Sequence, residues 1–144
     1  MVDTVANKLQ IANFIRSMTQ TIPIRVLQKA VKQAWDEATC YPGDLSRWSK
    51  NLPETGQCAV TALLINDIYG GEIVFNQAFD HFWNILPNGR ELDLTKGQFN
   101  RKVTGEKVPV TRDAILHSAA AKLFKTNSRY RLLKKRVDSL LSND

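Results

Sequence analysis

The sequence predicts a single α+β domain, with helices at both ends and a small antiparallel sheet in the middle. Its 144 residues are about one domain's length, and 43% of them are hydrophobic, which is enough for a packed core. Apolar residues recur at helical spacing near both ends, whereas short alternating stretches lie between them. We expect helices and a cleft loop over residues 1–55, a core carrying candidate catalytic residues over 56–100, and a basic helical part over 101–144.

The first part of the chain predicts two helices and a loop. Residues Asn7 to Met18 and Pro23 to Ala38 each carry an apolar stripe, and Pro23 suits a first helical turn. Residues Thr39 to Thr55 are rich in Pro, Gly, Asp and Ser, so we expect a loop there, anchored by Leu45 and Trp48. Such a loop is suited to form the wall of a cleft.

A buried helix is expected from Cys58 to Tyr69. Its residues are apolar nearly all round, so other elements must cover it, and Gly70-Gly71 ends it. Gly56-Gln57 leads into the helix, which places Cys58 at or near the first turn. Three short strands follow, at Glu72–Asn76, His81–Leu86 and Arg90–Thr95.

The turn between the second and third strands decides which side chains meet. A two-residue turn at Asn88-Gly89 would place Pro87 in a strand position that needs an N–H group. A three-residue loop, with Gly89 in the left-handed conformation, fits better and sets Leu86 opposite Arg90. One face of the hairpin then carries Phe82, Leu86, Leu92 and Leu94, and the other carries His81, Trp83, Asp93 and Thr95.

This register makes a nucleophile, a base and an orienting group available together. A cysteine at a helix start has its thiolate favoured by free N–H groups, and a neighbouring imidazolium lowers the thiol pKa further. We therefore expect Cys58 as nucleophile, His81 as base and Asp93 as the group that orients the imidazole. The Cys58 N–H is the natural oxyanion donor, and Gln57 is a weaker candidate for the same role.

These residues resemble the transglutaminase core. The matching segments are Gly56-Gln57-Cys58 opening a buried helix, His81-Phe-Trp83-Asn84 on a strand and Asp93-Leu-Thr95 on the next, in the order Cys, His, Asp. The resemblance implies a papain-like fold and an acyl-enzyme on cysteine, with transfer to water or an amine. Residues 25–100 also resemble the small bacterial YunG-like proteins. His81 follows Cys58 by only 23 positions, so the substrate-shaping insertions of large transglutaminases are missing.

The resulting hypothesis is a thiol-dependent hydrolase or acyltransferase that needs no cofactor. We expect its substrate to be a side-chain amide of a protein or peptide, or a small acyl compound, bound in a shallow site. The Thr39–Thr55 loop and residues 76–80 are the segments available to border that site. We expect a cytoplasmic protein, because no stretch has the roughly 18 apolar residues of a membrane span and the first twenty residues do not resemble a secretory signal.

Each candidate residue also has a structural interpretation. Cys58 could be a small core side chain, and with His81 and Asp93 it could bind zinc, although a fourth ligand is missing. Trp83 could form part of the cleft wall or simply pack across the strands, and Asn84 falls on the core face, where a structural role is expected. His117 has no acidic or thiol companion nearby in the sequence, and Cys40 is expected to be structural unless its loop folds over Cys58.

The positive charge is concentrated at the C-terminal end. The formal charge is +6, and residues 101–144 carry eleven Lys or Arg against four Asp or Glu. A solvated helix face explains this pattern, and no nucleic-acid motif accompanies it, so we expect no nucleic-acid partner. The rival hypothesis is a non-catalytic module that binds an anionic partner through a basic helix from Asn127 to Leu141.

Overall fold

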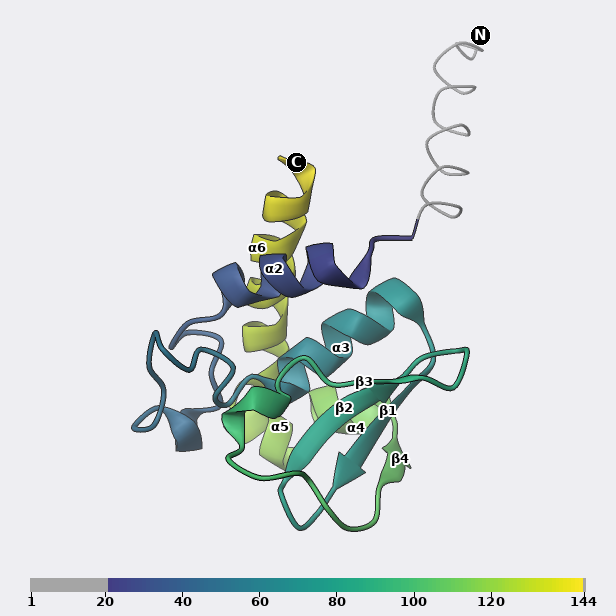
Figure 1. Ribbon diagram of the computed structural model, residues 1–144. Helices are drawn as coiled ribbons and strands as arrows, with labels where there is room; N and C mark the ends of the chain where they lie inside the picture. Colours follow the sequence, from purple (N-terminus) through teal and green to yellow (C-terminus); the bar gives the residue numbers. More distant parts are fainter. Residues whose placement is uncertain (1–20, 144) are drawn as a thin grey trace, which may run out of the picture.

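The computed structural model describes residues 21–143, so the helix expected over residues 7–18 lies outside the described part. Within it the fold is α+β, with five helices and one four-stranded antiparallel sheet (Figure 1). The helices are α2 (Ile24–Ala34), α3 (Cys58–Tyr69), α4 (Arg112–His117), α5 (Ala119–Leu123) and α6 (Thr126–Ser142). The strands are β1 (Glu72–Asn76), β2 (His81–Ile85), β3 (Glu91–Leu92) and β4 (Val108–Val110), and short 3-10 turns cover Pro42–Asp44 and Lys96–Gln98.

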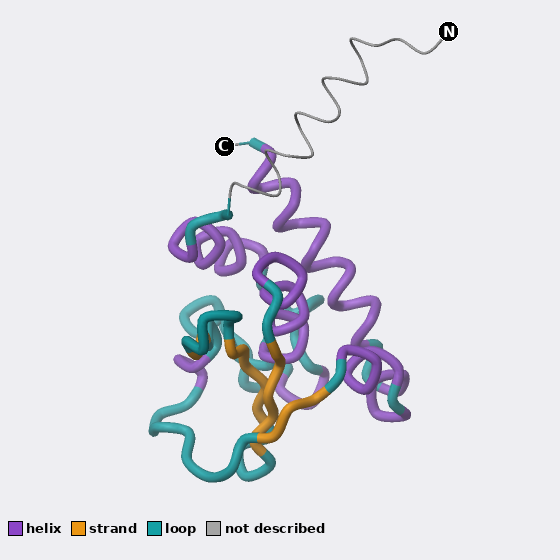
Figure 2. The backbone as a smooth tube through the Cα atoms, turned by 90° about the vertical axis from the view of Figure 1, so that its right-hand side faces the viewer, coloured by secondary structure: helices purple, strands orange, loops and turns teal. Residues whose placement is uncertain are grey.

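Helix α3 is the centre of the fold. It packs against α6 on one side and against β2 on the other, and its middle residues are completely buried. In Figure 2 the strands lie together in the lower part of the view, and most of the helical residues lie above and beside them. The predicted bounds and glycine stop are confirmed: Gly70 and Gly71 both have positive φ, and a Cβ on Gly71 would lie 2.2 Å from the carbonyl oxygen of Ile85.

Helix α2 ends four residues earlier than expected. Trp35 is already extended, with ψ of 134°. The Thr39 hydroxyl accepts a hydrogen bond from the Asp36 amide at 3.0 Å, and the Asp36 carboxylate accepts one from the Ala38 amide at 2.9 Å. Such side-chain acceptors compete with helical hydrogen bonding, and the apolar stripe does not reveal this competition.

The predicted hairpin is confirmed in turn and register. The Leu86 amide donates to the Arg90 carbonyl at 2.8 Å, Gly89 has φ of 86°, and Asn84 pairs with Leu92. Strand β3 is only Glu91–Leu92, shorter than the expected strand over residues 90–95, because the Asp93 carboxylate accepts the Thr95 amide and turns the chain.

A fourth strand was not predicted. Residues Val108–Val110 pair with β1, giving the sheet order β3-β2-β1-β4. The segment is short and contains Pro109, which an edge strand tolerates because one side of it makes no sheet hydrogen bonds.

The two faces of the sheet have different surroundings. Ile73 and Leu92 belong to the core around α3, and on the same face the Asn84 side-chain amide donates to the Ala62 carbonyl at 2.9 Å. His81 and Trp83 pair with Asn76 and Val74 of β1, so these four side chains share the other face. Asn84 is therefore a structural residue, as its register indicates.

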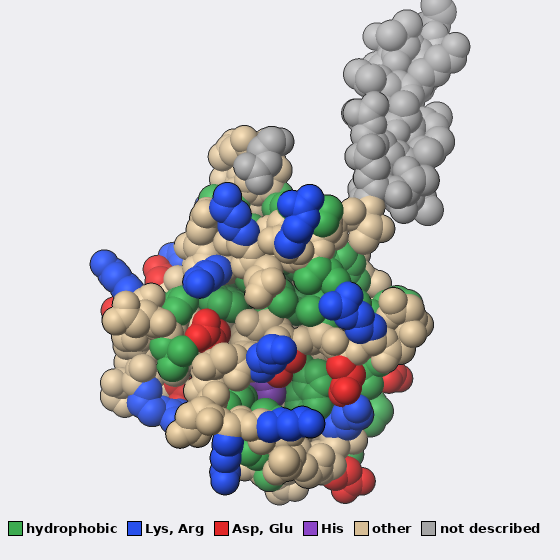
Figure 3. Space-filling view, viewed as in Figure 1, with side chains coloured by type: hydrophobic (Ala, Val, Ile, Leu, Met, Phe, Trp, Pro, Cys, Tyr) green, Lys and Arg blue, Asp and Glu red, His purple; other side chains and the backbone are tan. Residues whose placement is uncertain are grey.

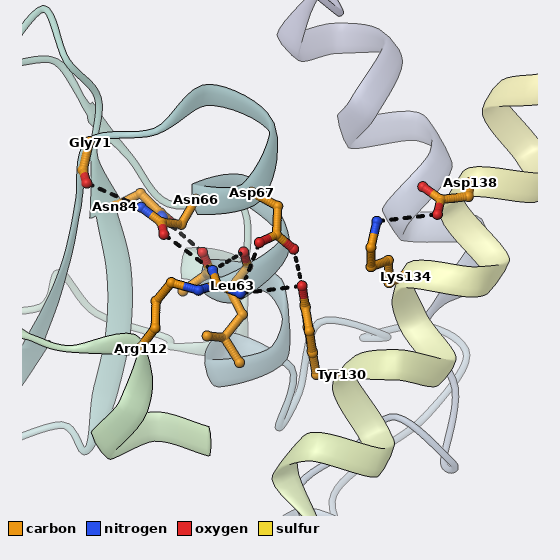
Figure 4. Close-up of polar contacts among 10 residues, drawn as sticks. Leu63, Asn66, Asp67, Gly71, Asn84, Arg112, Tyr130, Lys134 and Asp138 are labelled. Atoms are coloured by element: carbon orange, nitrogen blue, oxygen red, sulfur yellow. Dashed lines mark hydrogen bonds and ion pairs between the residues drawn. The ribbon is translucent and has the colours of Figure 1, made fainter. Parts of the chain in front are cut away.

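A polar network joins α3 to the C-terminal helices (Figure 4). The Arg112 guanidinium donates to the Leu63 carbonyl at 3.0 Å and pairs with Asp67 at 2.8 Å. The Tyr130 hydroxyl on α6 donates to the same Asp67 carboxylate. One arginine thus connects α4, α3 and α6.

Among residues 21–143, no helix is both long enough and apolar enough to cross a bilayer.

Candidate active site

Cys58 is the first residue of α3, and a glycine two positions earlier fixes its position. Gly56 has φ of 72°, and its carbonyl accepts a hydrogen bond from the Tyr41 amide at 2.8 Å. A Cβ on Gly56 would lie only 2.5 Å from the Cys40 sulfur. The loop that begins at Cys40 is therefore packed directly against the start of α3.

The Cys58 sulfur lies at the edge of the sheet, next to β2. The backbone N–H groups of Phe82 and Ala59 lie close enough to the sulfur to lower its pKa. Because amide groups alternate sides along an antiparallel strand and the Leu86 amide points to the β3 side, the Phe82 amide points to that side too. Cys58 is thus brought next to the residue that follows His81.

The direction of the Cys58 pKa corrects the expectation of an activated thiolate. Burial raises the pKa of the Cys58 thiol to about 11, and the carboxylates of Asp80 and Asp93 raise it as well. The two backbone amides lower it, but they do not offset the loss of water. The resting sulfur is consequently a thiol at neutral pH.

His81 and Asp93 are in direct contact, as the hairpin register predicts. The His81 Nε2 and Asp93 Oδ2 atoms are 2.6 Å apart, and His81 is completely buried. The other carboxylate oxygen accepts from the Thr95 amide at 3.1 Å and from its hydroxyl at 3.3 Å. A carboxylate only accepts, so Nε2 donates to it, and in the neutral imidazole Nδ1 then has a free lone pair.

The Nδ1 atom of His81 has no hydrogen-bond partner among residues 21–143, although it is buried. Buried polar atoms are nearly always paired, so an unpaired one indicates a function or a missing ligand. The Nδ1 atom makes no hydrogen bond to the Cys58 sulfur, which lies near the backbone of the neighbouring Phe82.

Aromatic side chains hold the imidazole in place. Trp83 stacks on His81 with ring centres 5.4 Å apart, and Phe99 meets the ring edge-on at 4.8 Å. The Trp83 indole donates to Glu91 at 3.1 Å, and Lys107 pairs with the same carboxylate, which holds the Glu91 pKa below its usual value. Trp83 therefore holds the His81 ring in place, and it does not line the cavity.

Gln57 is completely buried. Its amide nitrogen donates to the Asp36 carbonyl at 3.1 Å, and its Oε1 atom has no partner among the described residues. Gln57 does not line the cavity beside Cys58. Its oxyanion role stays a prediction, and the contact that the structure gives it connects α3 to the end of α2.

Cys58 opens onto a cavity of about 460 Å³. This volume lies within the roughly 300–1,000 Å³ of small-molecule sites, and the shallowness of the site stays a prediction. Both segments expected to border the cleft contribute to its wall, with Tyr41, Asp44 and Arg47 from one and Phe79 and Asp80 from the other.

A third part of the wall was missed. Side chains of β4, α4, α5, α6 and the connections between them close the cavity on the far side. These include Val110, Ala114, Ile115, Phe124 and Arg129. The sequence signal was present, because Ile115 and Phe124 are apolar residues in a basic region, but their partner could not be identified without the tertiary structure.

The remaining candidates have structural surroundings. Cys40 is buried, its thiol donates to the carbonyls of Tyr41 and Thr55 at 3.3 Å, and burial raises its pKa to about 11. His117 is exposed at the end of α4. No group of three or more His, Cys, Asp or Glu side chains within residues 21–143 is placed to hold a metal ion, so the zinc alternative gains no support.

The basic C-terminal segment is partly used inside the molecule. Arg129 is buried, and Arg136 donates to the Ala34 carbonyl and pairs with Asp36, both at 2.9 Å. Lys134 pairs with Asp138 on the same helix. On the face shown in Figure 3, basic side chains are spread over the surface with acidic ones among them.

Comparisons with known proteins agree with the YunG-like resemblance. No solved structure gives a significant match. A Bacillus subtilis (strain 168) protein, "Uncharacterized protein YunG", is 34% identical over 85 residues, which are 58% of this chain and 69% of the relative. The model of the YunG protein family matches residues 23–142, nearly the whole described part. The chain therefore belongs to the YunG family.

Proposed function

We propose that this protein is a thiol-dependent hydrolase or acyltransferase with a transglutaminase-like, papain-like core. Cys58 is the nucleophile, His81 the base and Asp93 the orienting group, and the substrate is an amide, ester or thioester. Protein or peptide side-chain amides and small acyl compounds are the candidate substrates.

One observation carries the proposal. A completely buried imidazole has one nitrogen on Asp93 at 2.6 Å and the other without a partner among the described residues, and the residue after it, Phe82, lines the same cavity as Cys58. A merely structural histidine in such a place would be expected to use both nitrogens. The arrangement fits a general base whose Nδ1 atom is free to accept a proton.

The first half-reaction forms an acyl-enzyme. The Cys58 sulfur attacks the carbonyl carbon while its proton moves to Nδ1 of His81, and the carbonyl electron pair moves onto oxygen. When the tetrahedral intermediate collapses, the bond to the leaving group breaks and the His81 imidazolium protonates that group. The products are a thioester on Cys58 and a free amine, alcohol or thiol.

The second half-reaction releases the acyl group. Water or an amine attacks the thioester carbonyl and gives its proton to His81, and the same proton returns to the Cys58 sulfur as the carbon–sulfur bond breaks. The products are an acid or a new amide, and the thiol is restored. Asp93 holds the imidazole in one tautomer and stabilises its charge in both halves.

The backbone of α3 supplies the oxyanion donor in this proposal. The first amide groups of a helix have no intrahelical acceptor, so the Cys58 N–H is available to the oxygen on which charge develops. The positive end of the helix dipole adds to this stabilisation.

A resting thiol makes the base essential at the moment of attack. Because burial raises the pKa of Cys58 to about 11, very little thiolate is present before substrate binds. The proton must therefore leave during the attack, and in this proposal His81 takes it. This differs from a resting thiolate–imidazolium pair.

The test is a panel of amide, ester and thioester substrates, including a glutamine peptide with and without an amine acceptor. Release of the leaving group is measured for the wild-type protein, for Cys58→Ala and for Cys40→Ala as the matched cysteine control. We expect turnover of at least one substrate, its loss in Cys58→Ala and its retention in Cys40→Ala.

The opposite outcome is also specific. If the folded wild-type protein turns over no member of the panel and Cys58 forms no adduct with an acyl probe, the catalytic proposal is wrong. The non-catalytic binding module is then the remaining hypothesis.

A further inference from the structure

Arg129 is a buried cation in the wall of the cavity. Only 8% of the residue is exposed, and it lines the same space as Cys58. Its Nε donates to the Phe124 carbonyl at 3.0 Å and its Nη1 to the Thr39 carbonyl at 3.1 Å, while its Nη2 makes a long contact of 3.4 Å with the Thr126 hydroxyl. A guanidinium has five N–H groups, so these contacts leave donors unused.

No carboxylate compensates this charge. Among residues 21–143, no Asp or Glu oxygen lies within 4.0 Å of an Arg129 nitrogen. The two carboxylates on the cavity wall are accounted for elsewhere, since Asp44 pairs with Arg47 and Asp80 is exposed. Burial lowers the pKa of Arg129, but a guanidinium stays charged at neutral pH.

A buried and uncompensated charge is costly, and an anionic ligand would remove that cost. The other residues of the cavity wall determine what the uncharged part of the ligand must be. It is largely apolar, and its aromatic members are Tyr41, Phe75, Phe79, Phe82, Phe99 and Phe124. The cavity thus offers one buried cation in an aromatic surrounding.

We propose that the cavity binds a small apolar monocarboxylate, with its carboxylate on Arg129 and its hydrocarbon part against the aromatic rings. This is the acid that hydrolysis of an apolar ester, amide or thioester at Cys58 would release. As a statement about substrate it rests on the proposed function, whereas the binding site itself does not.

Three eight-carbon ligands that differ in charge test the site by calorimetry: octanoate, octanol and octylammonium. Charge-assisted hydrogen bonds to Arg129 should make octanoate bind about tenfold or more tightly than octanol. Octylammonium should bind most weakly. In Arg129→Met, which keeps an apolar stem, octanoate should fall to the affinity of octanol while octanol changes little.

A pair of variants at alanine positions locates the site without changing Arg129. Ala114 lines the cavity and is on its exposed side, whereas Ala119 is exposed and does not line it. Ala114→Phe should therefore weaken octanoate and octanol alike, and Ala119→Phe should leave both unchanged. This pair keeps the test valid if Arg129→Met fails to fold.

Three results overturn the inference. Equal binding of octanoate and octanol by the wild-type protein, or no binding of either, removes the anion site. Octanoate binding that Ala114→Phe leaves intact places the ligand elsewhere. Octanoate binding by a protein that turns over no panel substrate and whose Cys58 forms no adduct with an acyl probe would instead refute the proposed function and leave the site standing.

Discussion

The two ends of α3 use polar residues in opposite ways. In the C-terminal half, Arg112 donates hydrogen bonds to Leu63 and Asn66. The Asp67 carboxylate forms an ion pair with Arg112 and accepts a hydrogen bond from the Tyr130 hydroxyl. At the N-terminal end, the His81 Nδ1 and Gln57 Oε1 atoms have no partner among the described residues, and Cys58 faces a cavity.

This contrast separates structural polar groups from candidate functional ones. Both regions are close to the core and both contain an acid next to a base, so residue type alone does not distinguish them. What differs is whether the polar atoms have hydrogen-bond partners. The side chains of the Arg112 network leave no buried polar atom unpaired and stabilise the packing of three helices, whereas the pair of His81 and Asp93 leaves one ring nitrogen without a partner among the described residues. The variants below test this distinction.

The largest effect is expected from Asp93→Asn. An Asn side chain can donate its amide to Nε2, which would move the ring proton to Nδ1 and remove the base. Turnover should fall about 10²–10⁴-fold, while the unfolding midpoint changes little. Glu91→Gln is the matched control, because that carboxylate lies on the same hairpin but bonds to Trp83 and Lys107; it should retain most of the activity.

The next effect is the titration of the Cys58 thiol. Its pKa is raised from 9.0 to about 11, so the protonated form is favoured in the folded protein. Thiolate absorbance in the ultraviolet, taken as wild type minus Cys58→Ala, should rise with a midpoint near pH 11, above the 9.0 of an ordinary thiol, and be absent at neutral pH. A transition near neutral pH would instead show a resting thiolate–imidazolium pair.

Stability should respond most at the other end of α3. Arg112→Met leaves Asp67 without its ion pair and frees the Leu63 carbonyl, so the free energy of unfolding should fall by about 1–3 kcal/mol. Urea denaturation measures this change. Turnover per folded molecule should stay the same, and the exposed Arg90→Met should affect neither quantity. Lost turnover in a folded Arg112→Met protein would break the proposed separation of the two ends.

The smallest expected effect is a difference in stability between two Gly→Ala variants. Gly56 and Gly89 both have positive φ, but a Cβ would meet the Cys40 sulfur at 2.5 Å in the first and nothing within 4 Å in the second. Gly56→Ala should therefore be less stable than Gly89→Ala by about 1–2 kcal/mol, measured by urea denaturation. Equal stabilities would mean that the close packing of Cys40 against the start of α3 is unimportant.

The sequence was most informative where local chemistry determines the geometry. Pro87 excludes the two-residue turn, so the register of the hairpin and the meeting of His81 with Asp93 follow from it. The bounds of α3 follow equally from its apolar run and the glycines after it. These predictions needed no information about distant segments.

Features that depend on distant segments were missed. Strand β4 and the wall from α4 to α6 are defined by packing against β1 and α3, and the sequence of residues 108–129 does not reveal those partners. The predicted direction of the Cys58 pKa shift was wrong for the same reason. The helix start, which lowers the pKa, was visible in the sequence, but the extent to which the folded chain buries the sulfur was not.

The central claim is that Cys58 attacks a carbonyl with His81 taking its proton. The direct measurement is acylation by a small-molecule octanoyl thioester at neutral pH, quenched in acid and mapped by mass spectrometry, with Cys40 as the internal control. We expect the acyl group on Cys58 alone, and acylation about 10²-fold slower in His81→Asn. Equal labelling of the two cysteines, or a Cys58 rate unchanged in His81→Asn, would contradict the claim.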